Sequence, residues 1–485
     1  MSKITRRGFI NRTLMLVGAA MLLLVCAKQQ PESKPDRPKP NFVFILADDL
    51  TFRDIGVYGG QAYTPHIDQL AKEGIRFKRA FQTAPMCSPT RHTIYTGLYP
   101  VKSGAYPNHT FANDDVKSIV QYLKPLGYRV ALSGKSHVAP ESVFPFEYSK
   151  ASPNYPEGSE SKTKRKNSPD FTAIEKLMSE SKESKNPFCL FVTSNEPHAP
   201  WDLGDPSRYP PEKLKLASYY VDTKVTREEL SKYYAEITYF DDEVGRTLAL
   251  LKKYKLDEST MVIVTSEQGN QLPFGKWTLY DTGLQTAFIA RWPGKIKANT
   301  VSDAMIEYVD VLPTFVKAAG GKVETDIDGK SILPVLLGDK TTHKEEVYGI
   351  MTTNGINNGS KLFPIRSIRT DDYKLILNLS PEEKFLNTIQ NQKIYLSWIA
   401  KAKVGDTDAQ DKIQRYNYRP AIELYSIKED VVEWNNLATD PKYADVITEL
   451  KTKLEAWMKE QGDLGIETEL KAPERQHYQR KTKTK

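Results

Sequence analysis

Acidic and amide side chains follow two apolar runs of the chain. "NFVFILA" leads into Asp48-Asp49, and "TMVIVTS" leads into Glu267-Gln268. Carboxylate and amide oxygens are hard donors, which suit Ca²⁺ or Mg²⁺ better than a zinc site. Taken alone, an Asp pair after a strand is equally well interpreted as a helix N-cap or a solvated turn.

Cationic and proton-transferring side chains follow two other apolar runs. "GKSH" supplies Lys135 and His137, "NEPHAPW" supplies His198, and Lys276 lies eight residues beyond Gln268. Because ligand sites of parallel α/β sheets gather at the carboxyl ends of the strands, we expect all these groups to meet. Together they would bind an anionic centre and move protons beside it.

Cys87, in "APMCSPTRHTIYTG", has no evident structural task. Of the two other cysteines, Cys26 ends the apolar run near the N-terminus, and Cys189 lies in "PFCLFVTS", where we expect a buried structural thiol. Cys87 therefore lacks a disulfide partner in an oxidising compartment. A free thiol among polar neighbours indicates chemistry, or a thiol that has been converted into another group.

The N-terminus predicts export. Arg6-Arg7 precedes an apolar run over 14–25 that is too short to span a bilayer, so 1–26 is interpreted as a twin-arginine-like signal peptide. Cys26 stands where a lipoprotein acceptor would. The two outcomes left open are a soluble periplasmic or secreted protein and one lipid-anchored to the cell envelope, with 27–40 as a flexible linker.

Composition favours a soluble globular enzyme. The chain has 485 residues, 39% hydrophobic and 27% charged, and a net charge of +7. Residues 1–40 carry +6 and the tail 471–485 carries +5, which leaves the body between them at −4. This distribution argues against nucleic acid as a partner, and it leaves the membrane as a partner only through an anchor at Cys26.

Apolar runs alternate with amphipathic segments, which predicts an α/β fold: a large, mixed, mostly parallel sheet sandwiched by helices. Residues 41–344 are expected to form this catalytic domain, with an exposed insertion at 150–169. From about residue 345 shorter strand-like runs predict a smaller antiparallel sheet-plus-helix domain over 345–470. The expected strands are 41–47, 128–133, 187–194 and 260–266, then 347–353, 365–370 and 373–378; the expected helices are 64–75, 114–127, 169–183, 226–254 and 445–462.

At this point the chain resembles a known family. "CSPTR" followed by "TG" matches the C-x-P-x-R signature of the sulfatases, in the alkaline phosphatase-like superfamily. The resemblance extends over nearly the whole mature chain and includes "NFVFILADDL", "GKSH", "PHAPW", "TSEQG", "GKW" and "RWPG". The stretch "TSEQGNQLPFGKWTLYDTGLQTAFIARWPG" is similar to the heparan N-sulfatase branch.

The resemblance implies that a maturation enzyme oxidises Cys87 to Cα-formylglycine, an aldehyde. Its hydrate would attack the sulfate sulfur with one hydroxyl, and deprotonation of the other would re-form the aldehyde and release sulfate. By the same resemblance, one Ca²⁺ ion would be bound by Asp48, Asp49, Glu267 and Gln268 together with the formylglycine at position 87.

The resemblance also assigns catalytic roles to the basic side chains. Arg91 and Lys135 would position the diol, and His137 would help to deprotonate it. His198 and Lys276 would bind sulfate and assist the departing oxygen, with His198 as the candidate general acid. His92 and His109 remain candidates for supporting or substrate-contacting roles.

Two positions depart from the family pattern. Glu267-Gln268 replaces the usual Asp followed by Asn, Asp or His, and each side chain is one methylene longer. We expect Ca²⁺ binding to survive because the oxygen donors are kept. Thr90 stands where Ser is commoner, and we expect maturation to tolerate it.

The resemblance therefore predicts a sulfuric ester hydrolase acting on a sulfated polysaccharide, of the ulvan, carrageenan or glycosaminoglycan type. N-sulfoglucosamine hydrolysis remains an alternative, as does a phosphatase or phosphodiesterase of the same superfamily, although the two-zinc ligand set of those relatives is absent. A noncatalytic sulfate-polymer binder is disfavoured because every catalytic position is filled. Loops 99–112, 141–169 and 350–364 are expected to bind the sugar, and Trp201 and Asp202 are candidate sugar contacts.

Overall fold

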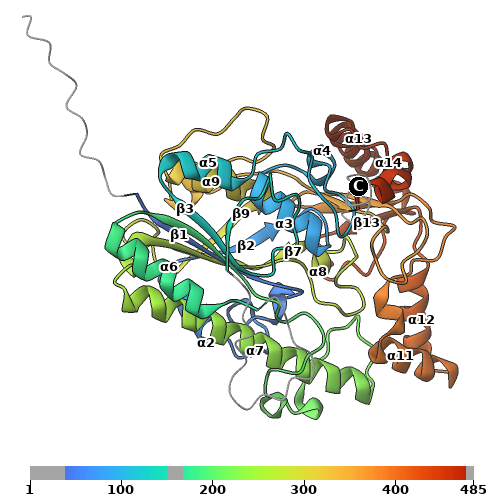
Figure 1. Cartoon of the computed structure of the whole chain (residues 1–485). Helices are drawn as coiled ribbons and strands as arrows, with labels where there is room; N and C mark the ends of the chain where they lie inside the picture. Colours follow the sequence, from blue (N-terminus) through green and yellow to red (C-terminus); the bar gives the residue numbers. More distant parts are fainter. Residues whose placement is uncertain (1–38, 150–167, 477–485) are drawn as a thin grey trace, which may run out of the picture. The chain divides into compact units, whose positions relative to one another are not determined.

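The computed structural model describes residues 39–149 and 168–476 (Figure 1). The predicted signal peptide, most of the linker, Cys26, most of the 150–169 insertion and the end of the basic tail lie outside the described residues. Among the described residues, no helix is both long and apolar enough to cross a bilayer.

Nine strands of the described chain form the larger sheet, in the order β4-β3-β5-β1-β6-β8-β2-β7, with β9 paired to β2. Pairing is parallel from β4 to β6 and between β2 and β9, and antiparallel where β8 meets β6 and β2 and where β7 meets β2. The mixed, mostly parallel sheet is thus confirmed. Its strands are β1 (Asn41–Ala47), β2 (Ile75–Phe81), β3 (Arg129–Gly134), β4 (Glu147–Tyr148), β5 (Phe188–Thr193), β6 (Thr260–Ser266), β7 (Gln285–Thr286), β8 (Phe288–Arg291) and β9 (Thr300–Glu307).

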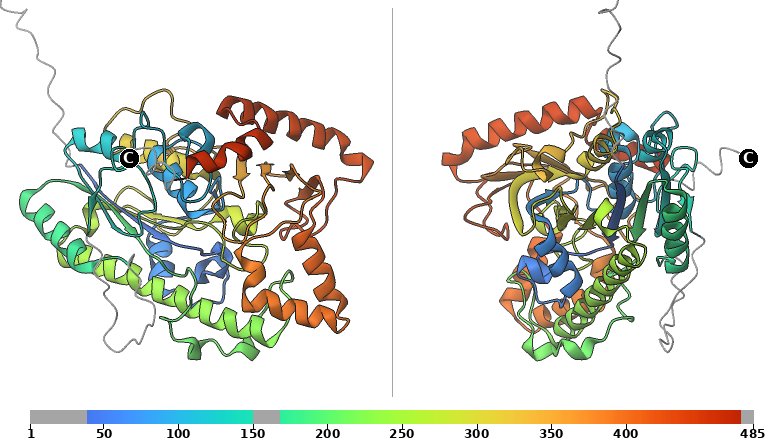
Figure 2. Two further views of the ribbon diagram at one scale, coloured as in Figure 1. Left: turned by 45° about the vertical axis from the view of Figure 1, so that its right-hand side comes forward. Right: turned by 90° about the vertical axis from the view of Figure 1, so that its left-hand side faces the viewer.

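Helices cover both faces of this sheet (Figures 1 and 2). All seven residues of β1 are buried, because successive side chains of a strand point to opposite faces and both faces are packed. Val43 and Ile45 belong to the core under α2, α6 and α7, whereas Phe42 and Phe44 belong to the core under α5, α9 and α10. These helices are α2 (Pro65–Glu73), α5 (Ile119–Leu123), α6 (Phe171–Ser184), α7 (Lys224–Lys253), α9 (Val311–Ala318) and α10 (Leu333–Leu336).

A smaller sheet follows in the chain, with antiparallel order β10-β11-β12-β13. Helix α13 packs on β11 and β12, and α11 lies beside the start of α7, where the Trp398 indole donates to Thr226 Oγ1 at 2.9 Å. This confirms the expected antiparallel sheet-plus-helix part. Its elements are β10 (Val347–Met351), β11 (Ile365–Arg369), β12 (Tyr373–Asn378), α11 (Lys393–Lys403), α12 (Thr407–Asn417), β13 (Ile422–Ser426), α13 (Ala444–Gln461) and α14 (Ile466–Lys471).

One predicted helix is shorter than expected. The segment 114–127 forms α5 only from Ile119, followed by a 3₁₀ turn over 124–126. Ser118 begins the helix as its N-cap and forms a capping box with Gln121, so the preceding residues stay outside it. The other predicted helices and strands are present, with ends that differ from the prediction by a few residues.

Candidate active site

The predicted strand ends meet because β3, β5, β1 and β6 are neighbours in the sheet. Backbone hydrogen bonds continue the ladder past each end: Glu267 N–H donates to Ala47 O at 2.9 Å, and Lys135 N–H donates to Thr193 O at 3.0 Å. Asp49 has a φ of 59°, in the left-handed region that few non-glycine residues occupy, and such strain is common at functional sites. The four strand ends therefore present their side chains at one edge.

Cys87 lies at the centre of this edge as the first residue of α3 (Cys87–Thr96), just beyond β2. Its buried Sγ accepts hydrogen bonds from Lys276 Nζ at 3.1 Å and from Gln268 Nε2 at 3.2 Å, and lies 3.5 Å from Asp48 Oδ1. The Thr90 hydroxyl donates to Ala84 O at 2.7 Å, which fixes the loop that enters the helix. Position 87 is thus held by groups that follow two neighbouring strands, β1 and β6.

The Cys87 thiol is neutral at physiological pH. Burial, followed by the negative charges of Asp48 and Glu267, raises its pKa to about 12. A thiolate, not a thiol, is the reactive form of cysteine. The arrangement therefore does not activate the unmodified sulfur as a nucleophile.

Four side chains with metal-ligating atoms crowd together here: Asp48, Asp49, Cys87 and Glu267 are all buried, and one ligand atom of each lies within 4.8 Å of the others. Burial raises the pKa of Glu267 to about 8, with Asp48 adding to the effect. Acidic groups packed this closely away from water are best stabilised by a cation.

The Gln268 amide completes this acidic cluster. Its Nε2 donates to Asp49 Oδ1 at 2.7 Å and to Glu267 Oε2 at 3.3 Å, while its buried Oε1 has no hydrogen-bond partner. A half-turn of the amide exchanges its two ends and directs the oxygen at the carboxylates, where it would bind a cation. The donor set therefore fits a hard divalent ion.

Arg91 and Lys135 hold the acidic cluster from one side. Arg91 is fully buried; its Nε donates to Glu267 Oε1 at 2.6 Å, and its Nη1 donates to Lys135 O at 2.5 Å. Lys135 Nζ forms an ion pair with Asp48, which also lies 3.8 Å from Arg91 Nη2. Burial alone would raise the pKa of Asp48, but Lys135 and its other neighbours hold it well below the ordinary value.

His198 and Lys276 approach the cluster from the opposite side, at Asp49. Lys276 is 2% exposed, and its Nζ lies 2.8 Å from the Asp49 carboxylate. His198 Nε2 lies 3.5 Å from Asp49 Oδ2, and its Nδ1 lies 2.6 Å from Ala199 O. Burial lowers the pKa of His198 despite the nearby carboxylates. Both side chains reach the space above Cys87.

His137 reaches the same pocket, paired with His109. His137 Nε2 lies 2.8 Å from His109 Nδ1, and His137 Nδ1 is buried without a hydrogen-bond partner. Burial lowers the pKa of both rings, and Lys135 adds to the effect. His92 lies on α3 itself and is buried, with Nδ1 2.7 Å from Ser88 O and Nε2 3.1 Å from Ala139 O, so it supports the helix rather than lining the pocket.

A pocket of about 420 Å³ opens above Cys87, and several of its lining residues have no sequence motif of their own. Asn108 and His109 come from the expected 99–112 loop, and Gly355 and Asn357 come from the 350–364 loop; the described part of 141–169 contributes none. Trp201 packs against Tyr233 and donates to Pro197 O at 2.8 Å, outside the pocket, so its role is packing. The lining residues outside every predicted residue and loop are Ser136, Asn195, Gln271, Trp277 and Thr388.

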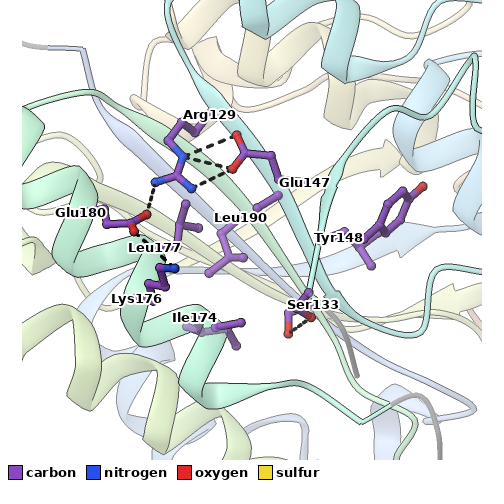
Figure 3. A pocket seen from close by; sticks show the side chains of 13 residues that line it. Arg129, Ser133, Glu147, Tyr148, Ile174, Lys176, Leu177, Glu180 and Leu190 are labelled. Carbon is purple, nitrogen blue, oxygen red and sulfur yellow. Dashed lines mark hydrogen bonds and ion pairs between the residues drawn. The ribbon is translucent and has the colours of Figure 1, made fainter. Parts of the chain in front are cut away.

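A separate pocket of about 210 Å³ lies at the outer edge of the sheet, between β3, β4 and α6 (Figure 3). Arg129 forms ion pairs there with Glu147 and Glu180 at 2.8 and 2.9 Å. Its lining includes Glu147, Tyr148 and Ser149, from the 141–169 segment that was expected to bind the sugar, but none of the predicted catalytic or metal-ligating residues. These partly exposed ion pairs connect an edge strand to a helix and are distinct from the cluster around Cys87.

Comparison with known proteins matches this architecture to one family. The sulfatase family model matches residues 40–321, and the model for the C-terminal part of N-sulphoglucosamine sulphohydrolase matches residues 269–395. An ulvan-active sulfatase of Formosa agariphila is 36% identical over 446 residues, covering 90% of this chain and 83% of the relative. Human N-sulphoglucosamine sulphohydrolase is 28% identical, covering 88% and 91%.

Solved structures share the fold. A protein in complex with its substrate D-glucosamine-2-N,6-O-disulfate superposes with a TM-score of 0.65 at 22% identity, covering 88% of this chain and 99% of that one. A 2-O GAG sulfatase gives a TM-score of 0.64 at 20% identity, covering 88% and 93%. The chain therefore belongs to the sulfatase family and is a sulfuric ester hydrolase.

Proposed function

We propose that this sulfatase removes sulfate esters from a sulfated polysaccharide or its oligosaccharides. The observation that carries the proposal is the burial of Cys87 against Asp48, Gln268 and Lys276, which places the signature cysteine among metal-ligating and cationic side chains. The 36% identity to an ulvan-active sulfatase supports a polysaccharide substrate. A catalytic domain over 41–344 and a C-terminal subdomain over 345–470 remain the proposed division of the chain.

The proposal includes conversion of Cys87 to Cα-formylglycine by a maturation enzyme, so that Sγ marks the place of the formylglycine oxygens. Once hydrated, this group supplies one hydroxyl that attacks sulfur and a second whose deprotonation releases sulfate. The neutral thiol, with a pKa of about 12, is consistent with a precursor rather than with a working nucleophile.

We assign the acidic cluster to one Ca²⁺ ion. Asp48, Asp49, Glu267 and Gln268 would hold it, and the unpartnered Gln268 oxygen supports a ligand role for the amide. When bound, the ion supplies Lewis-acid polarisation and orientation of the substrate. Arg91 Nε, 2.6 Å from Glu267 Oε1, orients the longer carboxylate.

The basic side chains around position 87 then bind the sulfate and move its protons. Lys276 Nζ, 3.1 Å from Sγ, donates to a sulfate oxygen and stabilises developing negative charge. His198 donates Nδ1–H to Ala199 O, so it protonates the leaving oxygen from Nε2 only in its imidazolium form. Burial disfavours that form by lowering the pKa of His198, and the Asp49 carboxylate acts in the opposite direction. Arg91 and Lys135 orient the hydroxyls at position 87.

His137 is the proposed base for sulfate release. Its buried Nδ1 accepts a proton only when its other nitrogen, Nε2, carries the hydrogen of the neutral ring and donates it to His109 Nδ1 at 2.8 Å. In this assignment His109 Nδ1 is the acceptor of that hydrogen bond, and His137 Nδ1 stays basic.

A second candidate substrate is an N-sulfated glucosamine. It is favoured by the match of residues 269–395 to the C-terminal part of N-sulphoglucosamine sulphohydrolase and by the 28% identity to the human enzyme. Hydrolysis of a panel of defined O-sulfated and N-sulfated sugars separates the two. The family assignment disfavours the phosphatase alternative.

We further propose that the protein is exported, and that it works in the periplasm or attached to the envelope through Cys26. The signal and the anchor lie outside the described residues, so this proposal rests on the N-terminal sequence. Its partners would be the sulfated carbohydrate and the maturation enzyme.

The experiment that tests the chemistry combines mass spectrometry with sulfate release. The peptide containing Cys87, taken from the native host, is expected to carry formylglycine in place of the thiol. The Cys87→Ala variant is expected to lose turnover completely and to keep the wild-type melting curve. An unmodified thiol in an active preparation, or near-normal activity of Cys87→Ala, would overturn the mechanism.

A further inference from the structure

The side of the pocket that carries His109 is a loop with partners far away in the chain. His109 lines the pocket, and its Nδ1 lies 2.8 Å from Nε2 of His137. Both histidines have positive φ angles, 56° and 50°, in the left-handed region that non-glycine residues seldom occupy. Such backbone conformations persist only where the surrounding structure enforces them. The contacts of the loop over 104–113 therefore decide how firmly this pair is held.

Both chain neighbours of His109 are bound by Arg475 and Gln476, near the end of the described chain. The Thr110 hydroxyl donates to Arg475 O at 2.8 Å, and Thr110 pairs with Gln476 in an isolated antiparallel bridge. On the other side, Gln476 Nε2 donates to Asn108 O at 3.2 Å. Gln476 is buried, so water does not compete for these bonds. His109 is thus fixed between two residues that one distant segment holds.

The Arg475 side chain binds the same loop at both of its ends. Its Nε donates to Gly104 O at 2.8 Å, and its Nη2 donates to Phe111 O at 3.0 Å and to Asn113 Oδ1 at 2.9 Å. The guanidinium carbon lies 4.3 Å from the centre of the Phe111 ring. Gly104 has a φ of 79°, and a Cβ at this position would lie 2.2 Å from Arg475 Nη2. One planar guanidinium therefore joins the two ends of the loop.

The segment that carries Arg475 and Gln476 is itself anchored to the C-terminal part of the chain. The backbone N–H and the hydroxyl of Thr353 donate to Glu469 Oε1 on α14, at 2.8 and 2.6 Å. Just before α14, Asp463 Oδ1 accepts from Nη2 of the fully buried Arg366 on β11 at 2.9 Å. The partner of the His109 loop is therefore a fixed element of the fold.

We propose that Arg475 and Gln476 are positioning residues for sulfate release, which hold His109 against His137. This inference rests on the proposed function, in which His137 Nδ1 takes the proton from the free hydroxyl of the sulfated residue 87. The carbon–oxygen double bond of the aldehyde then re-forms, the bond from that carbon to the sulfate oxygen breaks, and its electron pair leaves with sulfate. Neither Arg475 nor Gln476 lines the pocket, so both act through His109.

The kinetic consequence is specific to the release step. In a two-step reaction kcat/KM reports the steps up to cleavage of the substrate, whereas kcat also includes the release of sulfate. Impaired release therefore lowers kcat and KM together and leaves kcat/KM unchanged. It also makes the sulfated residue 87 accumulate, so the first turnover becomes a burst of the product alcohol.

The test uses full-length protein of measured formylglycine content, with 4-methylumbelliferyl sulfate as substrate. In Arg475→Met and in Gln476→Leu, kcat and KM are both expected to fall about 10- to 100-fold, since a misplacement of about 1 Å is enough for such a loss. A burst of methylumbelliferone should precede the slower steady state. His109→Ala should give the same signature, and the addition of Arg475→Met to it should cause no further loss.

Arg227→Met is the matched control. Arg227 also holds a loop, by donating to Pro211 O at 3.1 Å, to Leu214 O at 2.9 Å and to Asp222 Oδ1 at 2.7 Å, but it does not line the pocket. The control is expected to lower the melting midpoint while kcat and KM stay unchanged. Arg475→Lys, which keeps the charge, should recover part of the lost kcat.

Wild-type kcat in Arg475→Met and Gln476→Leu overturns the positioning role. A fall in kcat at unchanged KM does the same, because it reports only a smaller fraction of active enzyme. If either variant fails to fold, Arg475→Lys and Thr110→Val, which removes only the hydroxyl that donates to Arg475 O, decide by the same comparison of kcat with KM. Wild-type values in His109→Ala refute the route through His109. Matured wild type that hydrolyses no sulfate ester instead contradicts the proposed function.

Discussion

Replacing Lys276 by Met removes one ammonium and nearly preserves the length of the side chain. In the structure this ammonium has two partners: the Asp49 carboxylate at 2.8 Å and Cys87 Sγ at 3.1 Å. The first contact is present throughout the reaction. The contact with Cys87 Sγ points to the place of the formylglycine oxygen. Only there does the ammonium face a sulfate oxygen that gains negative charge during the reaction.

The expected loss is that of one preorganised donor in a water-excluded site. Lys276 is 2% exposed, so solvent does not replace its charge. Removal of such a donor typically costs about 2.7–4 kcal/mol of transition-state stabilisation, which corresponds to about 10²–10³ in kcat. Lys276→Arg keeps the charge and is expected to recover part of the loss.

The assay measures kcat and KM on 4-methylumbelliferyl sulfate at a temperature below the melting midpoint of every variant. Lys344→Met is the matched control, because Lys344 is a largely buried lysine in a similar ion pair, 2.6 Å from Glu307, but does not line the pocket. It is expected to lower the melting midpoint without changing kcat. A metal-loaded Lys276→Met enzyme within fivefold of wild-type kcat would refute the assigned role.

Two further outcomes follow from the buried charges. Removal of the metal by EDTA should abolish activity and lower the melting midpoint, and Ca²⁺ should restore both. At 100 times its Kd, a ligand stabilises the folded protein by about 2.7 kcal/mol. An unchanged midpoint would therefore contradict a metal at the acidic cluster. Asp463→Asn should lower the free energy of unfolding by about 3–5 kcal/mol in a urea titration, because Arg366 is fully buried and Asp463 Oδ1 accepts from its Nη2 at 2.9 Å. Burial alone would raise the pKa of Asp463, but Arg366 lowers it. The stabilisation from this ion pair is therefore fully present above the unfolded carboxyl pKa of about 4, and it is lost as the pH falls through the lower folded pKa. Glu228→Gln, which removes the exposed ion pair with Lys224, is the control and should leave the urea midpoint unchanged. A wild-type urea midpoint for Asp463→Asn would count against the stabilising role of the buried pair.

The sequence was sufficient to predict the strand ends that form the site. Fully buried parallel strands are continuous apolar runs, and the residues after them must share one sheet edge, so Asp48, Lys135, His198 and Glu267 were expected together before any distance was known. Cys87 was identified from its signature. The capping pair Ser118 and Gln121 was a readable local signal for the start of α5 that periodicity alone overlooked.

The lining of the pocket depends on contacts between segments that are far apart in the chain. Asn108 is placed by hydrogen bonds to Asn354 and Gly355, and His109 contacts His137 across the pocket. Loops carry no periodic pattern, and their conformations depend on partners far away in the chain, so residue types there do not reveal which atoms face a ligand. The catalytic edge thus follows from regular strands, whose positions the apolar runs specify, whereas the lining of the pocket depends on long-range packing.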